Sequence, residues 1–191
     1  MTKKRLHTNL EQERVNIFEL DLIIKYFEPK YLDKDEYFIK SGQICRNLAY
    51  IEKGIVLYYK IGDTGQEVVC DFAKEADWIT QYESFIHHSI SPISIKTIEE
   101  TELQVISFEG LRKLYMEVPA FEIYTRKLIE KYFIASMSRN NELQVLRAEE
   151  RYAKFAKENP EFIQRVPQYH IASYLGIAPQ SLSRIRKNFK G

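Results

Sequence analysis

Cysteine and long apolar runs are scarce in this chain of 191 residues. Two cysteines occur, Cys45 and Cys70, and each lies in an apolar, strand-like setting. We expect buried free thiols, because a zinc or iron–sulfur centre needs about four ligands at suitable spacing. No apolar stretch approaches the roughly 20 residues that a transmembrane helix requires. The sequence therefore predicts a protein with neither a metal centre nor contact with a membrane.

Export and catalytic motifs are also missing. The N-terminal Met-Thr-Lys-Lys-Arg leads into mixed polar sequence rather than the apolar core of a signal peptide, so we expect a cytoplasmic protein. We find no nucleophile paired with a base, no phosphate-binding glycine loop and no clustered ligands for non-haem iron. His87 and His88 are adjacent, so on a strand they would point to opposite faces. We expect no enzyme activity, no cofactor and no metal.

Acidic residues are absent from the C-terminal part of the chain, where basic residues gather. From Phe162 to Gly191 there is no Asp or Glu, although the whole chain has a net charge of only +1. The basic residues there are Arg165, Arg184, Arg186, Lys187 and Lys190. Positive charge gathered at one end suits a polyanion such as DNA.

The same region has the pattern of two short helices around a sharp corner. Apolar residues recur at helical spacing on both sides of a break: Ile171, Ala172 and Leu175 before it, and Leu182, Ile185 and Phe189 after it. Gly176 can adopt the left-handed backbone that ends a helix, and Pro179 fits the first turn of the next. We expect a helix-turn-helix whose second helix covers about 179–189.

The expected second helix has a solvent face without acidic residues. Because Gln can pair bidentately with adenine and Arg with guanine, Gln180 and Arg184 are the candidates for contacts with bases. Amide, hydroxyl and ammonium groups suit phosphate oxygens. The candidates for contacts with the DNA backbone are Gln168, Ser181, Ser183 and Lys187. A solvated helical hairpin without a DNA role is the alternative.

Residues 1–118 combine a helical lead-in with short strands. Residues 6–27 have apolar side chains spaced for one helical face, and Pro29 ends that segment. Between about Tyr37 and Phe108, short apolar and β-branched runs are separated by turn residues, which is typical of strands. The runs are 37–39, 48–51, 55–61, 67–72, 94–98 and 103–107. They predict a β-roll of the double-stranded, jelly-roll-like kind within an α+β fold.

A long helix follows the expected roll. It begins at Pro119 and continues to about Leu146 without an internal Gly or Pro. About 27 residues at 1.5 Å each span about 40 Å. Apolar residues on one side are Phe121, Tyr124, Leu128, Tyr132, Ala135, Leu143 and Leu146; Ile123, Ile129, Phe133, Ile134 and Met137 widen the surface. We expect a homodimer paired along 119–146, with packing inside one subunit as the alternative. Residues 147–191 then form the helix-turn-helix domain.

In this order of parts, the chain resembles the Crp/Fnr family, which includes the catabolite activator protein and the FNR regulators. The resemblance spans about Phe27 to Lys187. It is most specific at the strand, glycine turn and strand of 47–56, at 65–69 with 76–79, and at the helix-turn-helix. It implies a homodimeric transcription regulator whose second helix enters the major groove of double-stranded DNA at half-sites roughly 34 Å apart. By resemblance Pro179, Gln180 and Arg184 take the base-contacting positions, and Pro179 has no side-chain donor.

The expected effector pocket departs from that family. Members that bind cyclic AMP hold its phosphate with an Arg, but no Arg or Lys occurs between Lys74 and Lys96. A buried phosphate without a cation or N–H donors is left unpaired at a cost of several kcal/mol, so we expect weak binding of cyclic AMP unless backbone N–H groups replace the Arg. The expected pocket residues are Thr80, Gln81, Tyr82, Glu83, Ser84 and Ser91, with the small-molecule effector left open.

Two further departures concern oxygen sensing and the end of the chain. Residues 1–44 contain no cysteine, so the cysteine cluster of FNR-type sensors is missing. Few residues follow the expected second helix, where the family usually has a β-hairpin wing, so we expect fewer phosphate contacts and weaker binding. The alternative function is therefore a ligand-sensing or scaffold protein that no longer binds DNA specifically.

Overall fold

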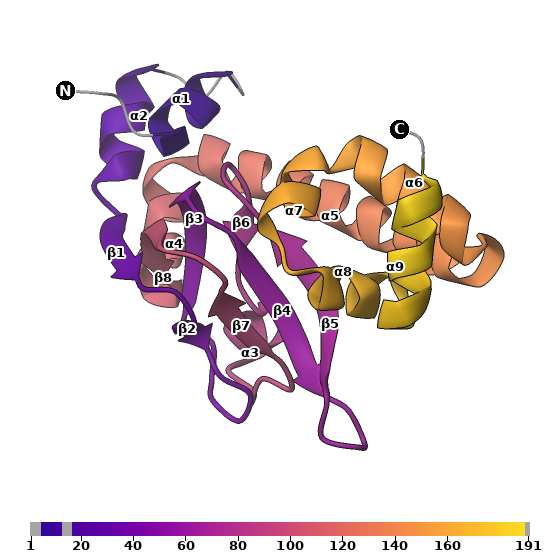
Figure 1. The fold of residues 1–191 in the computed structure, drawn as a ribbon. Coiled ribbons are helices and arrows are strands. Elements are labelled where there is room, and N and C mark those ends of the chain that lie inside the picture. The colour runs from indigo at the N-terminus through magenta and orange to yellow at the C-terminus, as the bar shows by residue number, and fades with distance from the viewer. Residues whose placement is uncertain (1–4, 13–16, 190–191) are drawn as a thin grey trace.

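The computed structural model describes residues 5–12 and 17–189, and it consists of a β-roll followed by a group of helices (Figure 1). The strands are β1 Glu28–Leu32, β2 Tyr37–Ile39, β3 Asn47–Lys53, β4 Val56–Ile61, β5 Glu67–Ala73, β6 Trp78–Ile79, β7 Ser94–Thr97 and β8 Thr101–Ser107. They form two antiparallel sheets with the orders β1-β8-β3-β6 and β2-β7-β4-β5. The α+β class predicted from the sequence is confirmed.

An apolar core lies between the two sheets. Alternate residues of a strand point to opposite faces, so each strand contributes every second side chain to this core. The buried residues are Leu32, Ile39, Cys45, Ala49, Ile51, Val56, Ala73, Ile79, Ile95 and Leu103. Cys45 is buried and Cys70 partly buried, and both are free thiols.

The six predicted strands are present, but two further strands were not predicted. We interpreted Pro29 as the end of a helix, whereas it lies inside β1. This strand is at the edge of its sheet and pairs with β8 alone, so a residue without an N–H is tolerated there. The strand β6 has two residues, which is too short for a recognisable pattern.

The predicted lead-in consists of two helices, α1 Arg5–Gln12 and α2 Ile17–Ile24, and its residues 13–16 lie outside the described part of the chain. The helices that follow are α3 Tyr82–His87, α4 Phe108–Glu117, α5 Pro119–Val145, α6 Ala148–Glu158, α7 Pro160–Arg165, α8 Gln168–Leu175 and α9 Pro179–Asn188. The long helix α5 has 27 residues and matches its predicted bounds. Of the helices after Pro119, α7 was not predicted. No helix in the described ranges is long and apolar enough to cross a bilayer.

The helices after α5 pack against the sheet that contains β4 and β5. Figure 1 shows α6–α9 beside these two strands, with α9 farther from the sheets than α8. One apolar core joins the two parts: Ile55, Leu57, Val69 and Phe72 of the roll meet Phe155, Phe162, Ile171 and Leu175 of the helices. Ser173 also accepts a hydrogen bond at its Oγ from the Val69 N–H, at 2.9 Å. The roll and the C-terminal helices are therefore one packed body.

Candidate DNA-binding surface and effector cavity

The two helices predicted as a helix-turn-helix are α8 and α9. Gly176 ends α8 with a φ of 63°, and its N–H donates to the carbonyls at the end of that helix. Pro179 opens α9 after Ala178. Ile171, Ala172, Leu175 and Leu182 are buried, as the apolar spacing predicts.

The outer face of α9 is open to solvent. Gln180 and Arg184 are four residues apart and Lys187 is three further on, so all three lie on one side of the helix. The residues predicted to contact DNA are all exposed: Gln168, Gln180, Ser181, Ser183, Arg184 and Lys187. α9 has no acidic residue, and Arg186 and Lys187 lie in its last turn. The arrangement offers hydrogen-bond donors and positive charge on one exposed face.

Arg165 does not belong to this basic surface. Its guanidinium donates to both carboxylate oxygens of Glu75, at 2.9 and 2.8 Å, and it also pairs with Glu99. The sequence predicts that Arg165 is available to a polyanion, but in the structure its charge is balanced by Glu75 and Glu99. The predicted positive charge is thus reduced to Arg184, Arg186 and Lys187 in the described residues.

This ion cluster fastens α7 to the β-roll. Burial alone would raise the pKa of Glu75, but the hydrogen bonds from Arg165 and from the Gly54 N–H lower it to about 2. Lys74 adds a second ion pair with Glu161, at 2.9 Å. The helix-turn-helix is therefore held to the roll by charge as well as by apolar packing.

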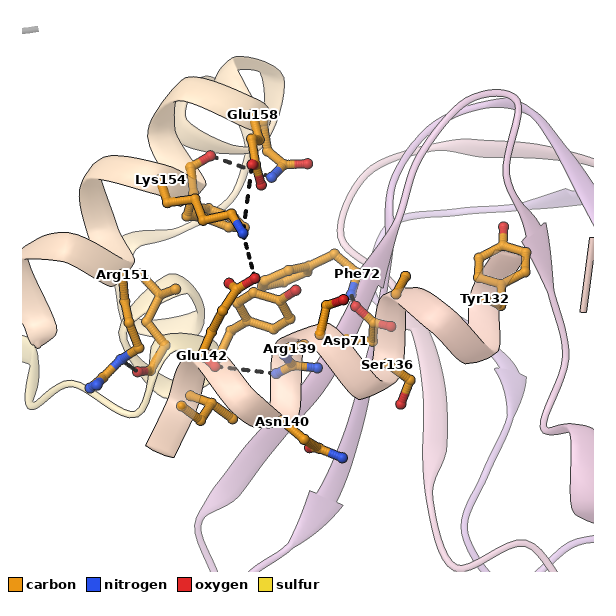
Figure 2. Close-up of a pocket in the computed structure, with 17 residues that line it drawn as sticks. Asp71, Phe72, Tyr132, Ser136, Arg139, Asn140, Glu142, Arg151, Lys154 and Glu158 are labelled. Atoms are coloured by element: carbon orange, nitrogen blue, oxygen red, sulfur yellow. Dashed lines mark hydrogen bonds and ion pairs between the residues drawn. The ribbon is translucent and has the colours of Figure 1, made fainter. Parts of the chain in front are cut away.

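A cavity of about 430 Å³ lies where α5, α6, α8 and β5 meet (Figure 2). The Arg139 guanidinium lies 3.7 Å from the ring centroid of Tyr174 and donates to the carbonyls of Tyr174 and Cys70. Lys154 pairs with Glu142 and Glu158, as Figure 2 shows. Arg139 and Lys154 are thus already bonded to groups of the protein. We interpret this cavity as a contact region between α5, α6, α8 and β5 and not as a ligand site.

A larger cavity, of about 870 Å³, lies between the roll and α5. Its wall is mainly apolar and aromatic, and includes Trp78, Tyr82, Phe85, Phe108, Tyr115 and Phe133. Trp78 is the single tryptophan of the chain. We call this space the effector cavity.

Only part of the predicted pocket contributes to the effector cavity. Thr80 and Tyr82 line it, but Gln81, Glu83, Ser84 and Ser91 do not. Gln81 caps α3 by accepting from the Ser84 N–H, at 2.6 Å. The buried Ser84 and Ser91 hydroxyls donate to the carbonyls of Ser89 and Ile93. These hydroxyls stabilise the loop around α3. Nearness in the sequence does not show whether a side chain points into a cavity or bonds to its own loop.

Charged groups of the effector cavity come mostly from elements outside the predicted stretch. Carboxylates are contributed by Asp71, Asp77, Glu122 and Glu130, and guanidinium groups by Arg112 and Arg126. Arg126 pairs with Glu130 at 2.6 Å. The prediction that the pocket lacks a cation, drawn from 74–96 alone, is wrong for this cavity, because both arginines reach it from α4 and α5. In the sequence, the one sign of their role is that each lies in a predicted helix close to apolar residues of the same cavity wall.

The residues predicted for the dimer face of α5 divide into two groups. Phe121 is fully buried in its own subunit. The hydroxyl of Tyr124 accepts from the Trp78 indole N–H at 3.0 Å, and that of Tyr132 from the Trp78 backbone N–H at 3.2 Å. Leu128 also packs against the subunit's own core, whereas Ala135 and Leu143 are exposed. The N-terminal part of α5 thus packs against the β-roll of its own subunit.

His87 and His88 lie at the end of α3. His88 ends α3 with a φ of 52°, and its ring packs on Phe108 with 4.6 Å between centroids. In the described part of the chain, no three His, Cys, Asp or Glu side chains are grouped so that they could hold a metal ion.

The structure is a β-roll joined by the long helix α5 to a helix-turn-helix, with a cavity between the roll and α5. The comparisons with known proteins agree. The family model for the cyclic nucleotide-binding domain matches residues 29–118. The transcriptional activator protein Anr of Pseudomonas protegens is 22% identical over 182 residues, covering 90% of this chain and 73% of Anr.

Two solved structures share the fold. The c-di-GMP responsive global regulator CLP of Xanthomonas campestris has a TM-score of 0.74 and 15% identity, with 91% of each chain covered. FixK2 of Bradyrhizobium japonicum has a TM-score of 0.73 and 16% identity, covering 86% of this chain and 89% of FixK2. The chain is thus similar in sequence to Anr and in fold to CLP and FixK2, and its residues 29–118 match the cyclic nucleotide-binding domain.

Proposed function

We propose that this protein is a homodimeric, DNA-binding transcription regulator that places α9 in the major groove. The observation that supports this most is the exposed, acid-free face of α9, on which Gln180 and Arg184 can reach base edges and Lys187 a phosphate. Cytoplasmic location and the absence of enzyme activity follow as part of the same proposal, since the DNA lies in that compartment and the relatives are regulators.

The proposed dimer rests on the later turns of α5. From Ile129 onward this helix carries large apolar side chains exposed to solvent: Ile129, Tyr132, Phe133, Ile134, Met137, Leu143 and Val145. Exposed apolar surface of this extent on one element is typical of an interface. A second copy of α5, related by a twofold axis, would cover it and set two copies of α9 at successive turns of the duplex.

Cyclic AMP is not the effector in this proposal. The Ser84 N–H at the start of α3 is already bonded to Gln81, and the cavity wall contains more carboxylates than guanidinium groups. A phosphate would meet few donors and net negative charge. The same argument applies to the cyclic dinucleotide to which CLP responds. Micromolar binding of cyclic AMP in a calorimetric titration would contradict this part of the proposal.

Two alanine variants test the DNA-binding surface. Arg184→Ala should relax the base preference at one operator position and weaken specific binding by about 1–3 kcal/mol. Lys187→Ala should weaken binding to all sequences similarly and flatten its dependence on salt. Fluorescence anisotropy on operator fragments identified from co-purified DNA measures both. Lys113→Ala, an exposed lysine on α4, is the matched control and should leave affinity unchanged.

Unchanged affinity in both variants would contradict the assignment of α9. It would favour the alternative, a ligand-sensing or scaffold protein whose helices no longer read DNA. A salt titration of binding to mixed genomic fragments separates the two, because DNA binding through Lys and Arg weakens steeply with salt.

A further inference from the structure

We propose that the effector cavity takes a largely apolar, neutral or cationic aromatic molecule rather than a phosphorylated one. This inference deepens the proposed function, because such a molecule would be the effector of the regulator. It rests on the shape, the charge and the hydrogen bonding of the cavity wall.

The apolar part of the wall favours a flat, ring-containing ligand. The cavity, at about 870 Å³, lies within the range of sites that enclose small organic molecules. Phe85 and Phe108 of the wall meet edge to face, with 5.4 Å between centroids. Trp78 also lines the cavity and is packed edge to face on Tyr50, at 5.2 Å. Rings held in this way offer rigid faces and edges to an aromatic guest.

The carboxylates of the wall discriminate against an anion. Asp71 and Asp77 each accept one backbone N–H, from Phe72 at 2.9 Å and from Lys74 at 3.0 Å. Desolvation raises the pKa of both carboxyl groups, and the nearby charges of Arg139 at Asp71 and Lys74 at Asp77 offset this only in part. A cationic or hydrogen-bond-donating ligand would stabilise these carboxylates, whereas a phosphate would repel them.

The donors that an anionic ligand needs are mostly in use. The Tyr115 hydroxyl is bonded to Thr125 Oγ1 at 2.8 Å, and the backbone N–H of Trp78 donates to the Tyr132 hydroxyl oxygen at 3.2 Å. Arg126 is paired with Glu130, and Arg112 is exposed on α4. An anion would have to break an existing ion pair or remain near the solvent.

The cavity also borders the residues that hold the helix-turn-helix. Asp71, Phe72 and Tyr132 line both this cavity and the smaller one of Figure 2. Arg139, which stacks on Tyr174 of α8, lies in the same smaller cavity and interacts electrostatically with Asp71. A ligand that reaches Asp71 would therefore contact a residue that also lines the smaller cavity, and Tyr174 of α8 lies in that smaller cavity.

The single tryptophan gives a direct test. Trp78 fluorescence is titrated with the neutral probe N-phenyl-1-naphthylamine and, separately, with its sulfonated analogue 8-anilino-1-naphthalenesulfonate. The neutral probe should quench Trp78 with a micromolar dissociation constant, and the sulfonate should bind at least about tenfold more weakly, because like charges repel in a cavity of low polarity. Equal or tighter binding of the sulfonate would overturn the proposal, and so would no quenching by the neutral probe.

A matched pair of variants shows whether the probe lies in the cavity. Ile86 lines the effector cavity and is 36% exposed, whereas Ile90 is 67% exposed and is not part of the wall. Ile86→Glu should reduce affinity for the neutral probe by about tenfold, because it adds a charge to an apolar wall. Ile90→Glu should leave it unchanged. Equal effects in both variants, with circular dichroism showing intact folding, would contradict the location.

Probe binding is measured without DNA, so its failure is separate from that of the proposed function. A protein that binds operator DNA but not the neutral probe contradicts the ligand class alone. A protein that takes the probe but binds no DNA contradicts the DNA-binding proposal alone. The comparison of the two probes needs no variant, so it stands even if Ile86→Glu does not fold.

Discussion

Gly54 lies in the turn between β3 and β4 with a φ of 108°, a conformation that other residues rarely adopt. A Cβ at this position would lie 2.8 Å from Thr101 Cα and 2.9 Å from the Glu100 carbonyl oxygen. Both neighbours are backbone atoms, so they cannot rotate away. Its N–H also donates to Glu75, which links the turn to the ion cluster under α7.

Gly54→Ala should therefore lower the free energy of unfolding by about 2–3 kcal/mol, since backbone strain and steric overlap add. Gly65→Ala is the matched control: its φ is 83°, but nothing lies within 4 Å of the added Cβ. That variant should lose only about 1–2 kcal/mol, from strain alone. Urea unfolding measures both, and equal losses would show that the contact with Thr101 has no effect.

At the scale of elements, the contact between α7 and the roll depends on protonation. The carboxyl of Glu75 has a pKa of about 2 in the folded protein against an ordinary value of 4.5. A lowered carboxyl pKa stabilises the folded state above the unfolded value, and that contribution is lost as the pH falls towards the folded value. The charge of Glu75 thus stabilises the docked helices throughout the neutral range.

The stability of the protein should therefore decline as the pH falls from about 4.5 towards 2, and Glu75→Gln should show a shallower decline in that window. The imidazole of His170 also titrates, but its effect on stability begins at a higher pH than that of Glu75. Burial lowers the pKa of its imidazole below 6.5, so its protonation reduces stability from about pH 6.5 downward in both proteins. Thermal unfolding followed at several pH values tests this. Parallel curves below pH 4.5 would contradict the role of Glu75.

At the scale of the whole molecule, the exposed half of α5 decides the proposed assembly. Ile134 is 65% exposed on this helix and lines neither cavity. Ile134→Glu should shift the protein from dimer to monomer, because two like charges would be buried near the twofold axis. Met116→Glu, at a residue of α4 that is 75% exposed, is the control and should leave the dimer intact. Sedimentation velocity measures both, and a monomeric parent protein would exclude the dimer.

Much of the fold could be predicted because its signals are local. The span of α5 follows from Pro119 and from the lack of an internal Gly or Pro, and Gly176 and Pro179 mark the corner of the helix-turn-helix. β1 was missed because the tolerance of Pro29 depends on its place at a sheet edge. That place is set by pairing with β8, more than 70 residues later.

The candidate site was predicted unevenly for the same reason. The exposure of the residues on α9 could be predicted because a short amphipathic helix fixes which side chains face solvent. The wall of the effector cavity could be predicted only at Thr80 and Tyr82, since it is contributed by β3, β4, β5, β6, α3, α4 and α5 together. Arg165 shows the limit most clearly: its charge is visible in the sequence, but its partners Glu75 and Glu99 are more than 60 residues away.

The sequence by itself determined the order of the parts, the type and length of the main elements and the basic outer face of α9, because periodicity and capping act within a few residues. Only the tertiary structure decided which apolar residues of α5 belong to its own roll, which charges are paired and what surrounds Trp78. Those outcomes depend on contacts between distant segments, and the energies of such contacts are not written in any local pattern.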